Sequence, residues 1–263
     1  MKVTTLIENT TGREDLFFEH GLSLYIETGD HRILFDAGQT GAFADNAEKL
    51  GVDLSKVDIA VLSHGHYDHS GGLIRFLACN ETAPIYLRRD AFLPHFNAAG
   101  KYIGLDPELK KSHRLIYTDD CMEIAEGITL YSCNDRQRTY PTDSAGLTVQ
   151  QDDSIIPDDF LHEQYLLIEE GGKKICISGC SHKGILNIAQ WFQPDVLIGG
   201  FHFMKLDTQD EGAKRLTEAA HCLLRHPTVF YTGHCTGEAQ YAFMKKIMGE
   251  RLQEIHTGSV FFV

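Results

Sequence analysis

The sequence lacks the features that export or anchor a protein. No stretch approaches the ~20 consecutive apolar residues that a membrane-spanning helix needs. The first nine residues alternate like a strand and contain neither the apolar core nor the small-residue cleavage site of a signal peptide. The seven cysteines include no CxxC pair, and their odd number is typical of reduced thiols. These absences predict a cytoplasmic protein.

Basic side chains are also scarce. The chain has 24 Lys and Arg against 37 Asp and Glu, which gives a formal net charge of -13. Such a charge would repel a phosphate backbone, and short basic pairs such as Arg88-Arg89 and Lys110-Lys111 are typical of solvated surface. We therefore expect a small-molecule substrate and neither a nucleic-acid nor a membrane partner.

A linker rich in Pro, Gly or Ser is missing as well. With 263 residues, of which 43% are hydrophobic, the chain is long enough to bury one large core, so we expect a single domain over residues 1–263. Residues 90–113 and 134–160 show little periodicity, and we expect irregular insertions there on the substrate side of the domain. His95 and Tyr102, in the first insertion, are expected to face a ligand.

The rest of the chain alternates between apolar strands and amphipathic helices. Period-two patterns or apolar runs bounded by turn residues predict strands at 2–8, 21–28, 31–36, 57–62, 85–87, 114–117, 127–133, 164–169, 173–178, 195–199, 228–232, 252–256 and 259–263. Apolar residues at helical spacing predict helices at 40–50, 72–78, 184–193, 210–225 and 236–248. This alternation indicates the α/β class.

A cluster of metal-binding residue types follows the predicted strand 57–62. It contains three imidazoles and one carboxylate within six residues, namely His64, His66, Asp68 and His69. Placed on the tight loop after a buried strand, His64 and His66 could hold one cation while Asp68 and His69 face a second. Neutral imidazoles leave a cation acidic enough to ionise water near neutral pH, and a carboxylate can orient that water. The cluster therefore predicts a catalytic site with two metals.

The cluster resembles HxHxDH, the signature of the metallo-β-lactamase superfamily, and Ile33–Gly38 looks like the family's strand that ends in Asp-x-Gly. Other segments resemble the subgroup named for 7,8-dihydropterin-6-yl-methyl-4-(β-D-ribofuranosyl)aminobenzene-5'-phosphate synthase, a methanopterin-pathway enzyme; they are Glu19–Ser23, Gly179–Ile185, Gly199–His202 and Gly233–Gly237. The resemblance implies a four-layer αββα sandwich around two divalent metal ions, with zinc favoured and iron or manganese as alternatives.

The resemblance also supplies the remaining ligands. His234 matches the family's last histidine. Two residues compete for the third histidine: His162 has the spacing from Cys180 that is usual in the superfamily, whereas His182 is the subgroup's match. We favour His182, because His162 lies at the entry to an amphipathic strand. Cys180 occupies the position of a metal-bridging Asp in many relatives; a thiolate there would favour zinc, and a protonated thiol would suit iron or manganese.

Further side chains are expected around the metals. Asp68 is predicted to act in catalysis as well as in metal binding, and His202, at a strand end, is a candidate electrophile or general acid. Asp36 is expected to accept a hydrogen bond from a metal-bound imidazole. A last group of candidates would contact the substrate: His20, Tyr67 and Lys205.

Three functions are compatible with such a site. The one we favour is a dinuclear metal-dependent hydrolase of a small anionic or aromatic ester, lactone, amide or phosphoester, with a metal-bound hydroxide as nucleophile. The subgroup's name implies a second, a pterin-type transferase that joins a dihydropterin pyrophosphate to a ribosyl-aminobenzene phosphate. The third is a metal-containing sensor or redox protein, although residue 66 is His where a di-iron redox site would carry Glu. A cytoplasmic location argues against β-lactam antibiotics as substrates.

Overall fold

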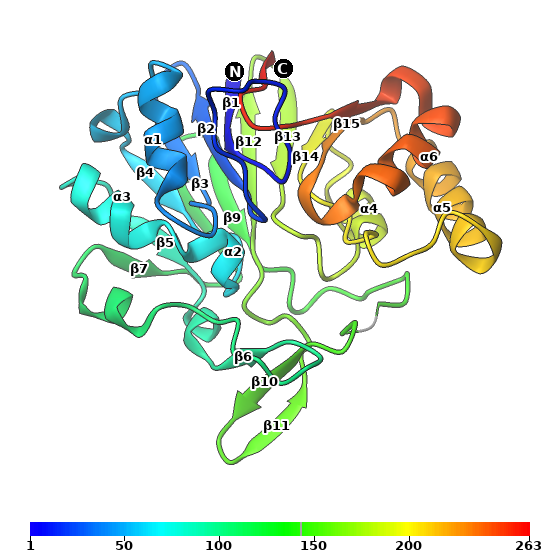
Figure 1. The fold of residues 1–263 in the computed structure, drawn as a ribbon, viewed down its shortest axis with the longest axis horizontal. Coiled ribbons are helices and arrows are strands. Elements are labelled where there is room, and N and C mark those ends of the chain that lie inside the picture. The colour runs from blue at the N-terminus through cyan, green and yellow to red at the C-terminus, as the bar shows by residue number, and fades with distance from the viewer. Residues whose placement is uncertain (143) are drawn as a thin grey trace.

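The protein folds into four layers. The computed structural model describes residues 1–142 and 144–263, so residue 143, within the second predicted insertion, lies outside the described residues. In the described part, two seven-stranded sheets pack face to face and helices cover the outer face of each (Figure 1). The αββα sandwich expected from the sequence is therefore confirmed.

The first sheet has the strand order β17-β1-β2-β3-β4-β5-β7, and it is parallel from β3 to β7. Helices α1 (Ala42–Lys49) and α3 (Leu73–Cys79) pack on its outer face. Its strands are β1 (Lys2–Ile7), β2 (Ser23–Glu27), β3 (Arg32–Phe35), β4 (Ile59–Val61), β5 (Ile85–Leu87), β7 (Leu115–Tyr117) and β17 (Val260–Phe262).

The second sheet has the strand order β16-β15-β14-β13-β12-β9-β8, and it is parallel from β13 to β16. Its strands are β8 (Cys121–Ala125), β9 (Ile128–Tyr131), β12 (Tyr165–Glu170), β13 (Lys173–Ile177), β14 (Val196–Ile198), β15 (Val229–Thr232) and β16 (Leu252–Glu254). Its outer face is covered by α4 (Ile185–Phe192), α5 (Asp210–Leu223) and α6 (Glu238–Met248). None of the described helices is both long enough and apolar enough to cross a bilayer.

The core lies on both faces of each sheet. Side chains such as Phe35 and Ile33 from the first sheet meet Ile175 and Ile177 from the second in a fully buried layer. Burying one such side chain stabilises the fold by roughly 1.5–3 kcal/mol relative to leaving it exposed. Because both faces are covered, the central strands are continuously apolar rather than alternating, as parallel strands buried on both faces generally are.

The carboxyl ends of the parallel strands bring the candidate residues together. Strands β3 and β4 lead into Asp36 and His64, and strands β13, β14 and β15 lead into Cys180, His202 and His234. Residues that follow neighbouring parallel strands gather at one edge of a sheet. The two halves of the sandwich therefore contribute to one site.

A small third sheet corrects the prediction of an irregular stretch over residues 134–160. Strands β10 (Thr148–Gln151) and β11 (Ser154–Pro157) form a hairpin there, and β6 (His95–Phe96) pairs with β10. All four residues of β11 are exposed, so its sequence carries no alternation that would reveal a strand. The hairpin projects away from the sandwich, beyond β6 (Figure 1). Residues Tyr67–Ser70, where the sequence predicted a loop, form the short helix α2.

Candidate metal centre

Three histidines from two parts of the chain converge in the interior. The side chains of His64, His66 and His182 each place one donor atom within 4.8 Å of the others, and all three residues are buried. Nε2 of His64 lies 3.3 Å from Nε2 of His182. We call these residues the three-histidine set. The structure thus brings together three of the ligands predicted from the sequence.

A second set of donors adjoins the first. Asp68, His69, Cys180 and His234 also place donor atoms within 4.8 Å of one another, and we call them the mixed set. Nε2 of His69 lies 3.2 Å from both Nε2 of His234 and Sγ of Cys180. Oδ2 of Asp68 lies 3.3 Å from Nε2 of His234. The seven predicted ligands are therefore divided between two neighbouring sets.

Hydrogen bonds on the outer side of the rings fix which nitrogen faces the centre. Nδ1 of His69 lies 2.6 Å from the carboxylate of Asp36, so it must donate. The Ser63 hydroxyl gives its proton to Asp36, so it accepts from Nδ1 of His64 at 2.8 Å. With Nδ1 protonated, the neutral form of each ring presents an unprotonated Nε2 to the centre, which is the form that binds a metal.

His234 is oriented in the same way by a residue from the other end of the chain. Its Nδ1 lies 2.8 Å from Oδ1 of Asn9, and that oxygen also accepts a hydrogen bond from the backbone N–H of Gly21. An oxygen that only accepts requires a proton on Nδ1, so Nε2 of neutral His234 is again unprotonated. Asn9 therefore acts on His234 as Asp36 acts on His69.

The spacing of the donors fits divalent metal ions. Ligands at the ~2.0–2.1 Å typical of zinc and imidazole in a tetrahedral site lie roughly 3.3–3.4 Å from each other. The separations of 3.2 and 3.3 Å in the two sets agree with this value. In addition, Nε2 of His66 is buried and has no hydrogen-bond partner among the described residues. A cation would satisfy that nitrogen and remove the repulsion between lone pairs that face each other.

Burial keeps most of these imidazoles neutral. It lowers the pKa of His64, His66 and His182 well below 6.5, and neighbouring histidines lower it further. Burial also lowers the pKa of His234, to about 4, against the effect of Asp68. His69 differs: burial opposes its ionisation, but Asp36 and Asp68 outweigh burial and raise its pKa. A cation in the mixed set therefore competes with a proton for His69.

The backbone at the site is strained. Asp36, Ser181, His202 and His234 all have positive φ, between 50° and 59°, in the left-handed region that non-glycine residues rarely occupy. All four lie just past the end of a strand that leads into the site. Such strain persists only where the surrounding structure over-determines the conformation, and it is concentrated at functional sites.

Two glycines after the metal-binding motif allow close packing against the first sheet. A Cβ atom on Gly71 would lie 2.0 Å from the carbonyl oxygen of Gln39, and one on Gly72 would lie 2.1 Å from that of Ala37. Any larger residue would push the motif away from the segment that follows Asp36. The glycine pair therefore allows the motif to pack directly against the segment that follows Asp36.

The other predicted site residues do not all lie beside the two sets of donors. Nε2 of His20 lies 3.3 Å from Oδ2 of Asp68, and its side chain is 42% exposed, so it connects the mixed set with solvent. The half-buried His202 packs its ring edge-on against His182, with centroids 4.4 Å apart. Tyr67 packs against an apolar group beside the site. Lys205 is exposed and donates to the carbonyl of Ala145 instead.

Sequence reasoning missed several residues that hold the ligands in place. Oε1 of Glu163 accepts a hydrogen bond of 2.7 Å from the backbone N–H of His182, and Phe160 stacks on the His182 ring at 4.4 Å. His95, expected to face a ligand, is fully buried against Asp158. These residues follow no motif, and the one available signal was the position of Glu163 beside His162.

Comparison with known proteins gives matches over most of the chain. A family model, the metallo-beta-lactamase superfamily, matches residues 16–211. An uncharacterised protein of Methanocaldococcus jannaschii is 31% identical over 212 residues, which cover 77% of this chain and 79% of that protein. The 7,8-dihydropterin-6-methyl-4-(beta-D-ribofuranosyl)-aminobenzene-5'-phosphate synthase of the same organism is 29% identical over 297 residues, which cover 99% of this chain and 96% of the synthase.

Solved structures resemble the chain over its whole length. The crystal structure of Tm1679, a metal-dependent hydrolase of the beta-lactamase superfamily, aligns with a TM-score of 0.83 at 26% identity and covers 100% of this chain and 99% of that one. Zn(2+)-bound PqqB from Methylobacterium extorquens aligns with a TM-score of 0.59 at 13% identity, covering 100% of both chains. The second likeness concerns the fold alone.

Proposed function

The chain belongs to the metallo-β-lactamase superfamily, and on this premise we propose that it is a metal-dependent hydrolase of a small ester, lactone, amide or phosphoester. One observation carries the proposal: two adjoining sets of buried donors meet at one centre, and hydrogen bonds to Nδ1 of His64, His69 and His234 direct the Nε2 of each ring toward it. The 26% identity with Tm1679, a metal-dependent hydrolase, supports the same reaction class. The charge of -13 and the cysteine pattern support a small-molecule substrate and a cytoplasmic location.

The two sets would divide the metals between them. The three-histidine set would hold one divalent cation, and Asp68, His69 and His234 of the mixed set would hold the second, with Cys180 as an additional ligand. Bound there, the cations would supply Lewis acidity, which lowers the pKa of water and polarises a carbonyl or phosphoryl oxygen. A sulfur donor beside nitrogen and oxygen donors favours zinc over iron or manganese.

The surrounding residues would orient the substrate and move protons. Asp68, whose side chain is 10% exposed, can accept a hydrogen bond from a water molecule at the edge of the mixed set. His202 lies against His182 and is partly accessible, so its ring can donate a hydrogen bond or a proton to the leaving group. Tyr67 lies within the motif and His20 lies beside Asp68, and both would contact the substrate.

Removal of the metals tests this proposal directly. Dialysis against a chelator should abolish hydrolysis of an activated ester or lactone, because the imidazoles alone supply no strong electrophile. Adding back zinc should restore the activity, and metal analysis of the purified protein should find about two ions per chain if both sets are filled. Full activity in protein shown to be free of metal would contradict the proposal.

The role of Cys180 can be tested separately. Burial raises the pKa of its thiol well above 9, so the thiol ionises here only if a cation binds it. Cobalt-loaded protein should therefore show a sulfur-to-cobalt absorption band in the near ultraviolet. Cys180→Ser should lose the band, whereas Cys121→Ser, at an exposed cysteine, should keep it. A band that survives in Cys180→Ser would exclude Cys180 as a ligand.

A transferase is the second candidate, and the 29% identity with the synthase of Methanocaldococcus jannaschii over 99% of the chain favours it. In that case the same cations would neutralise a leaving diphosphate while an aromatic ribosyl phosphate attacks. The two candidates differ in what they release. Pyrophosphate that forms only when an aromatic acceptor is present would identify the transferase, and hydrolysis without any acceptor would identify the hydrolase.

A further inference from the structure

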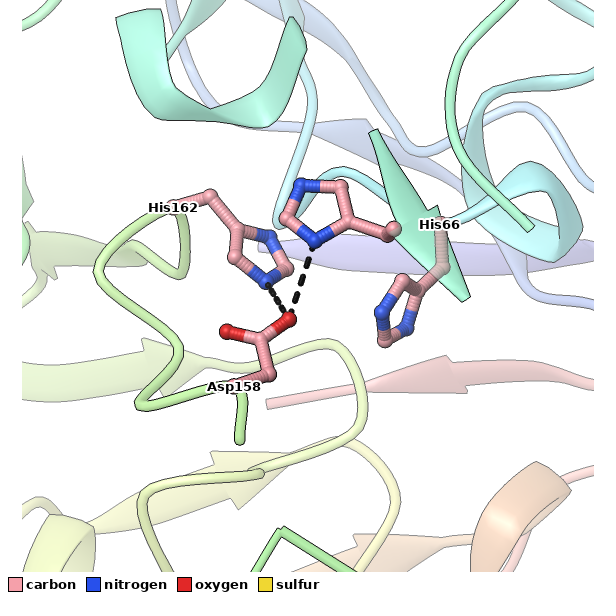
Figure 2. A group of neighbouring side chains, drawn as sticks. His66, Asp158 and His162 are labelled. Atoms are coloured by element: carbon pink, nitrogen blue, oxygen red, sulfur yellow. Dashed lines mark hydrogen bonds and ion pairs between the residues drawn. The ribbon is translucent and has the colours of Figure 1, made fainter. Parts of the chain in front are cut away.

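A buried group of polar side chains lies behind the three-histidine set. It consists of His95, Asp158 and His162, which are 0%, 5% and 1% exposed. Oδ2 of Asp158 lies 2.9 Å from Nδ1 of His95 and 3.2 Å from Nε2 of His162. His66 lies beside this group (Figure 2). These residues come from β6 and from the segment between β11 and β12.

The hydrogen bonds in this group use both nitrogens of His162. The backbone N–H of Gly65 donates to Nδ1 of His162 over 2.8 Å. Because a backbone N–H can only donate, Nδ1 is unprotonated and the proton of the neutral ring is on Nε2, where it points to Asp158. Neither nitrogen of His162 has a lone pair left for a cation. His162 has the spacing from Cys180 that is usual for a ligand, but its two nitrogens bind Gly65 and Asp158 instead.

The residue that His162 contacts lies at the centre of the metal-binding motif. Gly65 separates His64 from His66, so the position of its peptide group sets the distance between these two rings. On its other side Gly65 meets the backbone of Ala91, where a Cβ atom would come within 2.5 Å of the carbonyl oxygen. The motif is therefore confined between His162 and Ala91.

The same short segment also holds the third histidine of the set. Oδ1 of Asp158 accepts a hydrogen bond from the backbone N–H of Phe160 over 2.7 Å, and the Phe160 ring stacks on His182 with an angle of 10° between the planes. Glu163 then accepts from the N–H of His182. Residues 158–163 thus contact both parts of the chain that form the three-histidine set.

We propose that Asp158 and His162 are positioning residues for the three-histidine set. Asp158 holds His162 in the form that is protonated on Nε2, and Nδ1 of His162 then anchors Gly65 so that His64 and His66 stay in place opposite His182. The inference rests on the proposed metal-dependent function, because it concerns how that metal is held. It also makes His182, and not His162, the third histidine ligand.

A pair of matched substitutions tests this role through metal affinity rather than activity. In His162→Asn, the side-chain oxygen stands as many bonds from Cα as Nδ1 does, so it can still accept from Gly65. In His162→Gln, the polar group reaches the position of Nε2 and leaves the Gly65 N–H without an acceptor. Zinc titrations of both variants in chelator-buffered solution would be compared with a titration of His182→Ala. The binding step that His182→Ala loses is the step that belongs to the three-histidine set.

The expected results differ between the two variants. His162→Asn should bind zinc within about threefold of the wild type, and His162→Gln should lose roughly 10- to 100-fold in affinity at that step, as is usual when a residue that orients metal ligands is removed. If both variants lose the step as completely as His182→Ala, His162 is a ligand and the proposal is wrong. If both bind like the wild type, Gly65 needs no anchor and the proposal is also wrong.

Asp158 provides a second measurement that does not depend on substitution of His162. In Asp158→Asn, one amide oxygen cannot accept from His95, His162 and Phe160 together, so zinc affinity at that step should fall about tenfold. Adding Asp158→Asn to His162→Asn should not lower the zinc affinity below that of His162→Asn alone, because Asn has no tautomer to fix. Wild-type affinity in Asp158→Asn would overturn the proposal. Absence of any zinc binding by the wild-type protein would refute the proposed function instead.

Discussion

Replacing Asp68 with alanine is expected to lower hydrolytic turnover by at least about 1,000-fold, which corresponds to roughly 4 kcal/mol of transition-state stabilisation. Asp68 is the one carboxylate in the two sets of donors, and its Oδ2 lies 3.3 Å from Nε2 of both His234 and His20. Burial would raise the pKa of its carboxyl, but His69, His20 and His234 outweigh burial and lower it. Asp68 is therefore a buried negative charge beside the proposed cations, and alanine removes it.

Steady-state kinetics and metal analysis together would check this expectation. The variant should keep the near-ultraviolet circular dichroism of the wild type, because Asp68 is not part of the apolar core. The turnover of Asp68→Asn should lie between those of the wild type and Asp68→Ala, since asparagine retains an oxygen donor without the charge. Asp119→Ala, at an exposed aspartate, serves as the control and should stay within about twofold. Turnover of Asp68→Ala within tenfold of the wild type would contradict the assigned role.

The elements that were predicted correctly are those in which burial determines the local pattern. Within the predicted strands 57–62 and 195–199, residues 59–62 and 196–198 are continuously apolar because sheets and helices cover both faces of β4 and β14. The helix α5 shows its apolar stripe because one side packs against the second sheet and the other is exposed. In such segments the periodicity of the sequence directly reflects the layers of the fold.

The hairpin of β10 and β11 was missed for the opposite reason. Ile155 and Ile156 are 64% and 37% exposed, so neither face of β11 is distinguished by burial. Its pairing depends on β10 and on the distant β6, and not on a local pattern. Tertiary pairing of this kind leaves no periodic signal in a single sequence.

The candidate ligands were accessible to sequence reasoning, but most of the residues that orient them were not. His64, His66, Asp68 and His69 lie in one motif, which local spacing alone reveals. The hydrogen bond between Asn9 and His234, in contrast, joins residues 225 positions apart, and nothing in the sequence pairs them. Such contacts depend on how the two halves of the sandwich meet, which is a property of the assembled fold.

Asp36 is one of these orienting residues for which sequence position did suggest a role, and Asp36→Ala is expected to impair both folding and metal binding. The carboxylate is fully buried and accepts three hydrogen bonds, from the backbone N–H and the hydroxyl of Ser63 at 2.7 Å each and from Nδ1 of His69 at 2.6 Å. Each buried donor left without an acceptor costs roughly 1–3 kcal/mol. We therefore expect the free energy of unfolding of the metal-free protein to fall by about 3–5 kcal/mol.

The effect on metal binding should follow from the same contacts. Without Asp36, the proton of His69 is no longer held on Nδ1, and Ser63 no longer has a fixed hydroxyl direction with which to orient His64. Zinc affinity should therefore decrease by roughly 10- to 100-fold in both sets. Chemical denaturation with and without zinc, combined with zinc titration, would separate the loss of stability from the loss of zinc affinity. The two are linked because a ligand that binds only the folded state adds to its stability.

Asp36→Asn is the matched variant for this measurement. It preserves the size of the side chain, tolerates the φ of 59° at this position and keeps one acceptor oxygen. Its unfolding free energy should consequently lie between those of the wild type and Asp36→Ala, while its zinc affinity should stay low, because an amide cannot accept from both Ser63 and His69. Unfolding free energies within about 1 kcal/mol of the wild type for both variants would show that Asp36 is not the residue that joins β3 to the metal-binding motif.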